Sequence, residues 1–232
     1  MKKHLNKFSL DKSLAFRFLF ALSIATGLSV AAQTQNISVH KIAYSLSMSR
    51  PVSHLFEVKI QVQTIAIVDH VDFQMPRWSP GRYGVFDFAK NVQEFRAFSN
   101  SADKLKLTVT RLNDQTWRVA TNGQLPKEIS VTYKVFGDDL SGTFSQLDSR
   151  HANFNGGSIF MYIVDHKPDP VTLEINSPND WRIINGYTPT PDQNQWQFAN
   201  YDLMIDTPTV LNPLWTLDTF TVGEKTYRVV VT

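Results

Sequence analysis

The chain contains no cysteine in its 232 residues. This absence excludes disulfide bonds, a thiol nucleophile, a cysteine-ligated zinc site and a lipid attached to an N-terminal cysteine. Without cross-links, the fold must be stabilised by its hydrophobic core. A chain of about 200 residues can form such a core, because it buries roughly 70% of the surface that its unfolded state exposes.

Histidine is scarce as well, and its six positions exclude the common zinc motifs. No histidine is followed by glutamate, so H-E-x-x-H is absent, and no two are three or four residues apart. One helical face therefore cannot present a histidine pair to a metal. The chain also lacks G-x-S-x-G, a Walker loop and G-x-G-x-x-G. We predict no catalytic residue, no metal site and no cofactor in this chain. The absence of these motifs leaves open whether the chain belongs to an enzyme.

Two adjacent pairs, Asp69-His70 and Asp165-His166, have the residue types of a base and the acid that orients it. Successive side chains of a strand point to opposite faces, so neither pair can act together within a strand. We expect no catalytic role for either pair.

The chain also lacks an apolar run long enough to cross a membrane. Its longest run, residues 18–30, is shorter than the ~20 residues of a spanning helix. Basic residues precede this run and Ala31 and Ala32 follow it, a pattern typical of a secretory signal peptide. We predict a signal peptide over residues 1–32, cleaved after Ala32 or alternatively Ala31, with an uncleaved anchor as the other interpretation. The mature protein would be exported, periplasmic or secreted, and free of the membrane.

The charge of the chain favours no nucleic-acid partner. It has 23 basic and 21 acidic residues, of which five basic and one acidic lie in residues 1–32. The remainder therefore carries 18 basic and 20 acidic residues. A nucleic-acid-binding surface would require a stripe of Lys and Arg with interleaved aromatic residues, and no such stripe is present.

Alternation of apolar and polar residues dominates the rest of the sequence. It runs through residues 56–63, 104–109, 128–135 and 171–176. Because successive strand side chains point to opposite faces, each segment predicts a strand with one buried and one exposed face. Such strands are typical of antiparallel sheets packed face to face. Further strands are predicted near residues 38–48, 71–75, 116–121, 158–164, 181–185, 195–198 and 226–231.

The predicted fold class is therefore all-β: one antiparallel β-sandwich with long loops, over residues 33–232. One short helix or turn is expected over residues 86–95, where Phe88, Val92 and Phe95 share a helical face.

Two stretches do not fit the strand pattern. Residues 75–83 read M-P-R-W-S-P-G-R-Y, and two prolines cannot lie in a central strand. Residues 148–157 mix polar, aromatic and glycine residues before an apolar segment. Long ordered loops on a rigid sandwich are common recognition sites, and a well-packed turn is the alternative.

These stretches resemble the N-terminal domain of the glycyl aminopeptidases, metallopeptidase family sixty-one. The resemblance covers roughly residues 37–231. It is carried, in the family's order, by residues 75–83, Asp87-Phe88-Ala89, residues 133–140, residues 147–156, and Tyr201-Asp202 with Asp206 and Pro208. Two positions depart from the family's pattern, Arg82 where a small serine is usual and Phe86 where a basic residue is common.

The resemblance implies a β-rich, non-catalytic domain that precedes a thermolysin-like catalytic domain and packs on it. The zinc ion, its ligands and the general base are expected in that second domain, which this chain does not include. The partners implied are the protein's own catalytic domain and a peptide substrate.

The same resemblance implies that this domain would form one wall of the substrate cleft. The candidate residues are His151, Asn153, Asn155, Gly156 and Tyr83. The asparagines can accept a hydrogen bond from an α-amino group or donate one to a carbonyl, and glycine permits close backbone approach.

Two alternatives remain at this point. An independent carbohydrate- or peptide-binding module would present a shallow groove lined by some of Trp78, Trp181, Trp196 and Trp215, although core packing is expected for most of them. A stand-alone hydrolase is disfavoured, because the sequence lacks the nucleophile and metal-binding motifs that hydrolysis would require.

Overall fold

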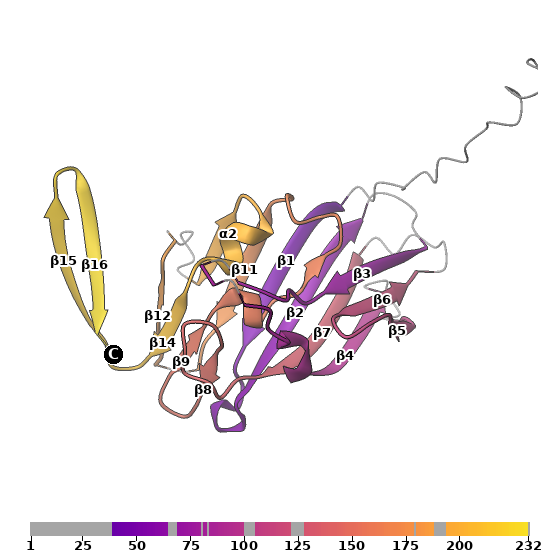
Figure 1. The fold of residues 1–232 in the computed structure, drawn as a ribbon, viewed down its shortest axis with the longest axis horizontal. Helices are drawn as coiled ribbons and strands as arrows, with labels where there is room; N and C mark the ends of the chain where they lie inside the picture. The colour runs from indigo at the N-terminus through magenta and orange to yellow at the C-terminus, as the bar shows by residue number, and fades with distance from the viewer. Residues whose placement is uncertain are drawn as a thin grey trace, which may run out of the picture. The chain divides into compact units, whose positions relative to one another are not determined.

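The computed structural model describes residues 39–64, 69–79, 81–82, 84–99, 105–121, 128–178, 180–187 and 194–231. The predicted signal peptide, residues 1–32, lies outside these ranges, as does the candidate Tyr83. Within them, no helix has the length and apolar character needed to cross a membrane. Strands dominate the described chain, which confirms the all-β prediction (Figure 1).

The largest sheet has six strands in the order β13-β11-β1-β2-β7-β4. All neighbours pair antiparallel except β1 and β11, which run parallel with Ile42 opposite Val171. The six strands are β1 (Val39–Ser47), β2 (Leu55–Thr64), β4 (Val92–Ser99), β7 (Glu128–Phe136), β11 (Val171–Asn176) and β13 (Gln195–Phe198).

Two smaller sheets have four strands each. One has the order β10-β3-β6-β5, built from Tyr162–Ile163, His70–Gln74, Thr116–Ala120 and Val109–Arg111. The other has the order β12-β14-β9-β8, built from Arg182–Asn185, Thr209–Asn212, Ala152–Phe154 and Gln146–Leu147. The last two strands, β15 (Thr216–Val222) and β16 (Lys225–Val231), form a separate hairpin.

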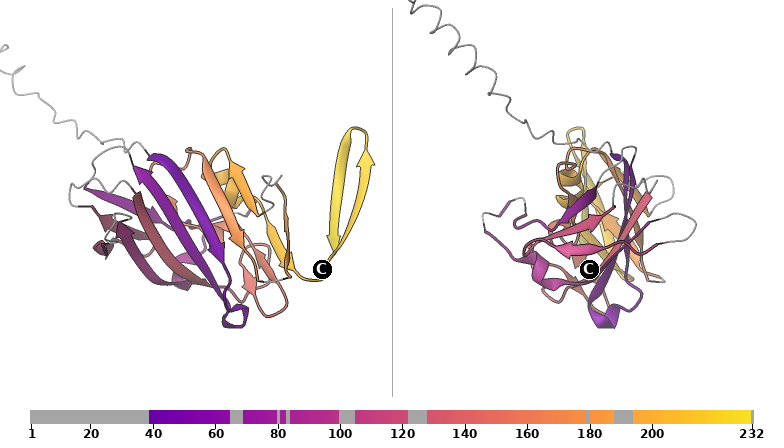
Figure 2. Two further views of the ribbon diagram at one scale, coloured as in Figure 1. Left: turned by 180° about the vertical axis from the view of Figure 1, so that it is seen from behind. Right: turned by 90° about the vertical axis from the view of Figure 1, so that its right-hand side faces the viewer.

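Both smaller sheets pack on the same face of the large sheet (Figures 1 and 2). Phe56 of β2 contacts Phe154 of β9 with ring centroids 5.9 Å apart, and Phe95 of β4 stacks on Trp117 of β6 at 5.5 Å. The predicted sandwich is therefore confirmed, with one large layer covered by two small ones.

The buried face is the one that the alternation predicts. The inward-facing apolar residues of β2, β7 and β11 are at most 2% exposed, whereas the alternate residues are half-buried or exposed, apart from the buried Ser130. At the strand ends, Leu55 of β2 is half-buried and Phe136 of β7 is 41% exposed. Burial of each large apolar side chain contributes roughly 1.5–3 kcal/mol, so these rows supply much of the stability. The buried residues of the three strands are Phe56, Val58, Ile60, Val62, Ile129, Val131, Tyr133, Val135, Val171, Leu173 and Ile175.

The strand predicted over residues 158–164 is mostly wrong. Only β10, Tyr162–Ile163, pairs with a neighbour, and the 3-10 helix η3 (Gly156–Ser158) precedes it. Buried backbone groups need partners, and here tyrosine hydroxyls replace a neighbouring strand. The carbonyls of residues 159, 160 and 161 accept hydrogen bonds from Tyr133, Tyr201 and Tyr44, respectively.

Three other boundaries differ from the prediction. In residues 104–109 the regular strand begins only at Val109, and Leu105 is 57% exposed. The expected helix is a single 3-10 turn, η2 (Phe88–Asn91), and residues 92–95 already belong to β4. The predicted strand over residues 226–231 pairs with β15, which was not among the predicted strands. The remaining helices of the described residues are the 3-10 helix η1 (Pro51–Ser53) and α2 (Tyr201–Ile205).

Candidate functional site

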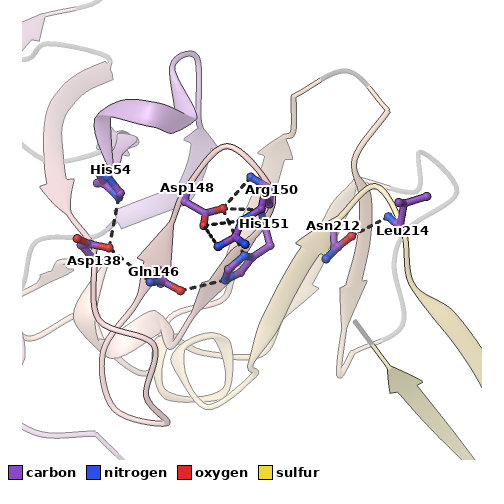
Figure 3. A network of polar contacts seen from close by, with 8 residues as sticks. All are labelled: His54, Asp138, Gln146, Asp148, Arg150, His151, Asn212 and Leu214. Carbon is purple, nitrogen blue, oxygen red and sulfur yellow. Dashed lines mark hydrogen bonds and ion pairs between the residues drawn. The ribbon is translucent and has the colours of Figure 1, made fainter.

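The candidate loop lies between β8 and η3, and its first turn is built around Asp148 (Figure 3). Oδ1 of this carboxylate accepts hydrogen bonds from the backbone N–H groups of Arg150 (2.7 Å) and His151 (3.0 Å), while Oδ2 accepts from the Arg150 guanidinium (2.9 Å). Burial alone would raise the pKa of Asp148, but these hydrogen bonds outweigh it and lower the pKa to about 2. The carboxylate therefore serves to fix the turn rather than to exchange protons near neutral pH.

His151 belongs to the same polar network (Figure 3). Its Nε2 lies 3.0 Å from Oε1 of Gln146, and its Nδ1 lies 3.3 Å from Asp148. The amide nitrogen of Gln146 in turn donates to Asp138 at 3.4 Å, and Asp138 lies 3.5 Å from His54 Nδ1. With both ring nitrogens facing partners within the protein, His151 holds the loop in place.

The next residues, Asn155 to Gly157, form the start of η3. Oδ1 of Asn155 accepts a hydrogen bond from the backbone N–H of Gly157 at 3.0 Å and so caps this short helix. Both Gly156 and Gly157 are buried. A Cβ atom on Gly156 would lie 2.7 Å from Cα of Ile205, so this glycine permits close packing of η3 against α2.

Asn153 and Asn155 line a hollow of about 450 Å³, which we call the Asn153 hollow. Asn153 lies on β9 opposite Val210 of β14, with its side chain on the face opposite to the buried Ala152 and Phe154. The side chain of Asn153 makes no hydrogen bond with another described residue, so its amide oxygen and its amide nitrogen are both available to a ligand. The other lining residues are Leu140, Ser141, Gly142, Phe154, Pro208 and Val210.

The lining of the Asn153 hollow offers hydrogen-bonding and apolar groups. Its lining contains amides, one hydroxyl and apolar groups, but no titratable side chain. General acid or base catalysis requires such a side chain within hydrogen-bond reach of the substrate. Across the described ranges, no cluster of three His, Asp or Glu residues could hold a metal ion.

The predicted candidates thus separate into different roles. The structure brings Asn153 and Asn155 to one hollow, places His151 in the adjoining polar network and buries Gly156. The sequence did not point to Leu140 or Val210, because their approach to Asn153 depends on the pairing of β9 with β14.

The strand expected around Asp165-His166 is wrong. Asp165 and His166 do not lie in a strand, since Asp165 has a positive φ of 67° in a turn. His166 instead faces Asp169, with Nδ1 2.7 Å from Oδ2, and it is 9% exposed. The backbone carbonyl of this histidine accepts from the N–H of Asp169, so the pair closes a turn before β11.

A family model described as the Peptidase M61 N-terminal domain matches residues 43–212 of this chain. Among solved structures, the aminopeptidase N family protein from Idiomarina loihiensis is 26% identical with a TM-score of 0.73. That match covers 82% of this chain and 32% of the Idiomarina chain. The M1 zinc metallopeptidase from Deinococcus radiodurans is 11% identical with a TM-score of 0.44, over 84% of this chain and 47% of the other. The chain thus spans about a third of the first protein and about half of the second. No curated protein matches it.

Proposed function

Because the chain belongs to the family described as the Peptidase M61 N-terminal domain, we propose that it acts as the non-catalytic N-terminal domain of an exported zinc aminopeptidase. In this proposal it packs against a thermolysin-like catalytic domain, which holds the zinc ion. The Asn153 hollow then contributes one wall of the cleft that binds the peptide substrate.

The observation that supports packing on another domain is the composition of the β15–β16 hairpin. Seven of the sixteen exposed large hydrophobic residues of the described chain fall within residues 214–231. The register places five of the hairpin's apolar side chains on one face, which we call the apolar hairpin face. They are Phe220, Val222, Tyr227, Val229 and Val231.

This face lacks a partner within the described chain. Both hairpin strands pair only with each other, and every side chain in them is exposed except the half-buried Val230. An isolated two-stranded hairpin is marginally stable in water, and exposed apolar patches commonly mark interaction surfaces. The hairpin also lies outside residues 43–212, the part that matches the family domain. We therefore assign the apolar hairpin face to contact with the catalytic domain.

Association with a catalytic domain can be measured directly. The partner is a polypeptide comprising the part of the Idiomarina protein that this chain does not cover. We expect a saturable complex by isothermal titration calorimetry, abolished by Phe220→Asp on the apolar hairpin face. Thr221→Asp, on the opposite face of the same strand, is the matched control and should bind normally. Absence of binding, or equal binding by the two variants, contradicts the proposal.

The non-catalytic role has its own test. Purified residues 33–232, supplied with zinc, should not hydrolyse glycine or alanine p-nitroanilide. Hydrolysis that a chelator abolishes would overturn this role.

The cleft role is assigned to Asn153, because Oδ1 of Asn155 is already used in capping η3. In a full-length relative, alanine at the position equivalent to Asn153 should raise KM for a peptide substrate without lowering the melting temperature. Alanine at the position equivalent to Asn155 should lower the melting temperature as well, since it removes a cap. An unchanged KM in both variants rules out a role in the cleft.

Export is tested by N-terminal sequencing of the protein recovered from the periplasm or medium. We expect the first residue to be Gln33, the residue after Ala32. An intact N-terminus that begins at Met1 would contradict cleavage.

A further inference from the structure

A second hollow, of about 420 Å³, lies where β3 ends and the chain continues into residues 75–79. We call it the Trp78 hollow. Gln74, at the end of β3, pairs with Tyr162 of β10 on one side and with Thr116 of β6 on the other, so the floor is part of a sheet. Its lining includes Gln74, Arg77, Trp78, Tyr162, Lys167 and Asp202.

Trp78 differs from the tryptophans that pack in the core. It is 58% exposed, whereas Trp117 is 7% exposed and Trp196 only 2%. An exposed indole ring is a large, rigid apolar surface that has not been removed from water. Pro76, two residues earlier in the same wall, restricts the backbone that carries this ring. Trp78 therefore offers an aromatic platform at the side of the hollow.

Lys167, which also lines the hollow, is held in position by its neighbours. Its ammonium group lies 4.5 Å from the ring centroid of Tyr162, 5.5 Å from that of Tyr201 and 3.4 Å from Oδ1 of Asp202. Two cation–π contacts and an ion pair limit the conformations of a side chain that is otherwise flexible. The ammonium and carboxylate groups thus place a donor and an acceptor next to each other.

Further polar groups complete the rim. The guanidinium of Arg77 lies 3.8 Å from the carboxylate of Asp114, and both side chains are more than half exposed. An exposed pair at this distance is weak, so Arg77 remains able to donate to a ligand. The amide of Gln74 adds one donor group and one acceptor.

We infer that the Trp78 hollow binds a saccharide. A sugar hydroxyl group both donates and accepts hydrogen bonds, and the rim supplies acceptors and donors side by side. The C–H face of a pyranose ring is flat and apolar, and it matches an exposed indole ring. Small-ligand sites typically combine an aromatic surface with a small number of polar groups placed around it. This inference is independent of the catalytic domain, since every residue in it belongs to this chain.

An extended peptide fits the hollow less well. Peptides that dock on sheets add a strand to an open edge, and their backbone hydrogen bonds supply the affinity. The sheet edge nearest the hollow is β10, which has only two residues. Two residues of β10 form too few backbone hydrogen bonds to hold an added peptide strand.

The test is titration calorimetry of purified residues 33–232 with cello-, xylo-, malto- and chito-oligosaccharides. We expect saturable binding of at least one of them. Trp78→Ala should weaken it by roughly tenfold or more, and Trp78→Phe should restore part of the loss because it keeps an aromatic face. Val85→Ala is the control, since this side chain is 81% exposed and lies outside the hollow. Circular dichroism establishes that each variant is folded.

Three outcomes overturn the inference. They are the absence of binding to every oligosaccharide, binding that Trp78→Ala leaves unchanged, and binding of Ala-Ala or Gly-Gly peptides alone. Because the isolated chain is used, these results do not depend on whether the apolar hairpin face docks on a catalytic domain.

Discussion

The hydroxyl group of Tyr133 accepts a hydrogen bond from the backbone N–H of Met161 at 2.9 Å. The same hydroxyl donates to the carbonyl of Ile159 at 3.0 Å, and Tyr44 and Tyr201 donate to the two carbonyls that follow. All three tyrosines are at most 2% exposed. The segment between η3 and β10 thus crosses the core without strand partners. In the chain it lies between Asn155, which lines the Asn153 hollow, and Tyr162, which lines the Trp78 hollow.

Removal of one of these hydroxyls should destabilise the fold. Tyr133→Phe leaves the N–H of Met161 and the carbonyl of Ile159 buried without their partner. An unsatisfied buried group costs about 1–3 kcal/mol, so we expect a loss of roughly 2 kcal/mol or more in urea unfolding. Tyr162→Phe is the control, because this half-buried hydroxyl has no hydrogen bond with another described residue. Equal unfolding midpoints for the two variants would refute this role of Tyr133.

The same tyrosines predict alkaline sensitivity. Burial raises the pKa of Tyr44, Tyr133 and Tyr201 above the usual value of 10. In the unfolded state they ionise near pH 10, whereas in the folded state they stay protonated. Their contribution is complete below about pH 10 and is lost as the pH rises further, by up to roughly 1.4 kcal/mol per pH unit for each tyrosine.

Denaturant unfolding at pH 9, 10 and 11 measures this effect. The free energy of unfolding should fall steeply above pH 10, and Tyr133→Phe should reduce the slope by about a third. A free energy that stays constant from pH 9 to pH 11 would contradict the assignment.

Close packing at Gly156 yields a matched pair of variants. In Gly156→Ala the new Cβ would lie 2.7 Å from Cα of Ile205, and a backbone atom cannot move aside as a flexible side chain can. We expect a loss of about 1–3 kcal/mol, as is usual for overpacking. Gly142→Ala meets no atom within 4 Å and should be neutral or slightly stabilising. Thermal unfolding that ranks the two variants in the reverse order would show that η3 can move away from α2.

The strands could be predicted from the sequence wherever one local pattern decides the structure. The alternation in residues 56–62 identifies both the strand and its buried face, because a slip of one residue would expose Phe56 and Val58. Residues 158–164 read equally well as a strand. Their actual backbone partners are hydroxyls distant in the sequence, such as Tyr44, 117 residues from Met161. Local periodicity carries no information about such contacts.

The candidate site was predictable to a similar extent. Asn153 and Asn155 are predictable as candidates because their loop mixes polar and glycine residues and because their amides can both donate and accept, and both residues line a hollow. The capping role of Asn155 and the packing role of Gly156 depend on three-dimensional contacts with η3 and α2. From the sequence, Trp78 was one of four tryptophans that could line a groove. Which of them is exposed depends on which ones the sheets cover, so the sequence alone could not single out Trp78.

Asp148 provides a pH-dependent test of the turn that precedes Asn153. Its folded pKa of about 2 lies below the ordinary value of 3.8, so its contribution is complete above about pH 4 and is lost as the pH falls through 2. Asp148→Asn keeps one acceptor oxygen but loses the charge that faces Arg150, which is exposed to solvent and partly screened. We expect a loss of about 1 kcal/mol at pH 7, measured as a melting temperature lower by roughly 2–4 °C.

At pH 2 most of the difference between the two proteins should disappear, because the carboxylate is then about half protonated in the folded wild type and almost fully protonated in its unfolded state. Asp218→Asn on the hairpin is the control, since this exposed side chain makes no hydrogen bond with another described residue, and it should match the wild type at both pH values. A deficit of Asp148→Asn that is equal at pH 7 and pH 2 would mean that the ionised carboxylate does not stabilise the turn. The position of Asn153 would then depend on its pairing with β14 alone.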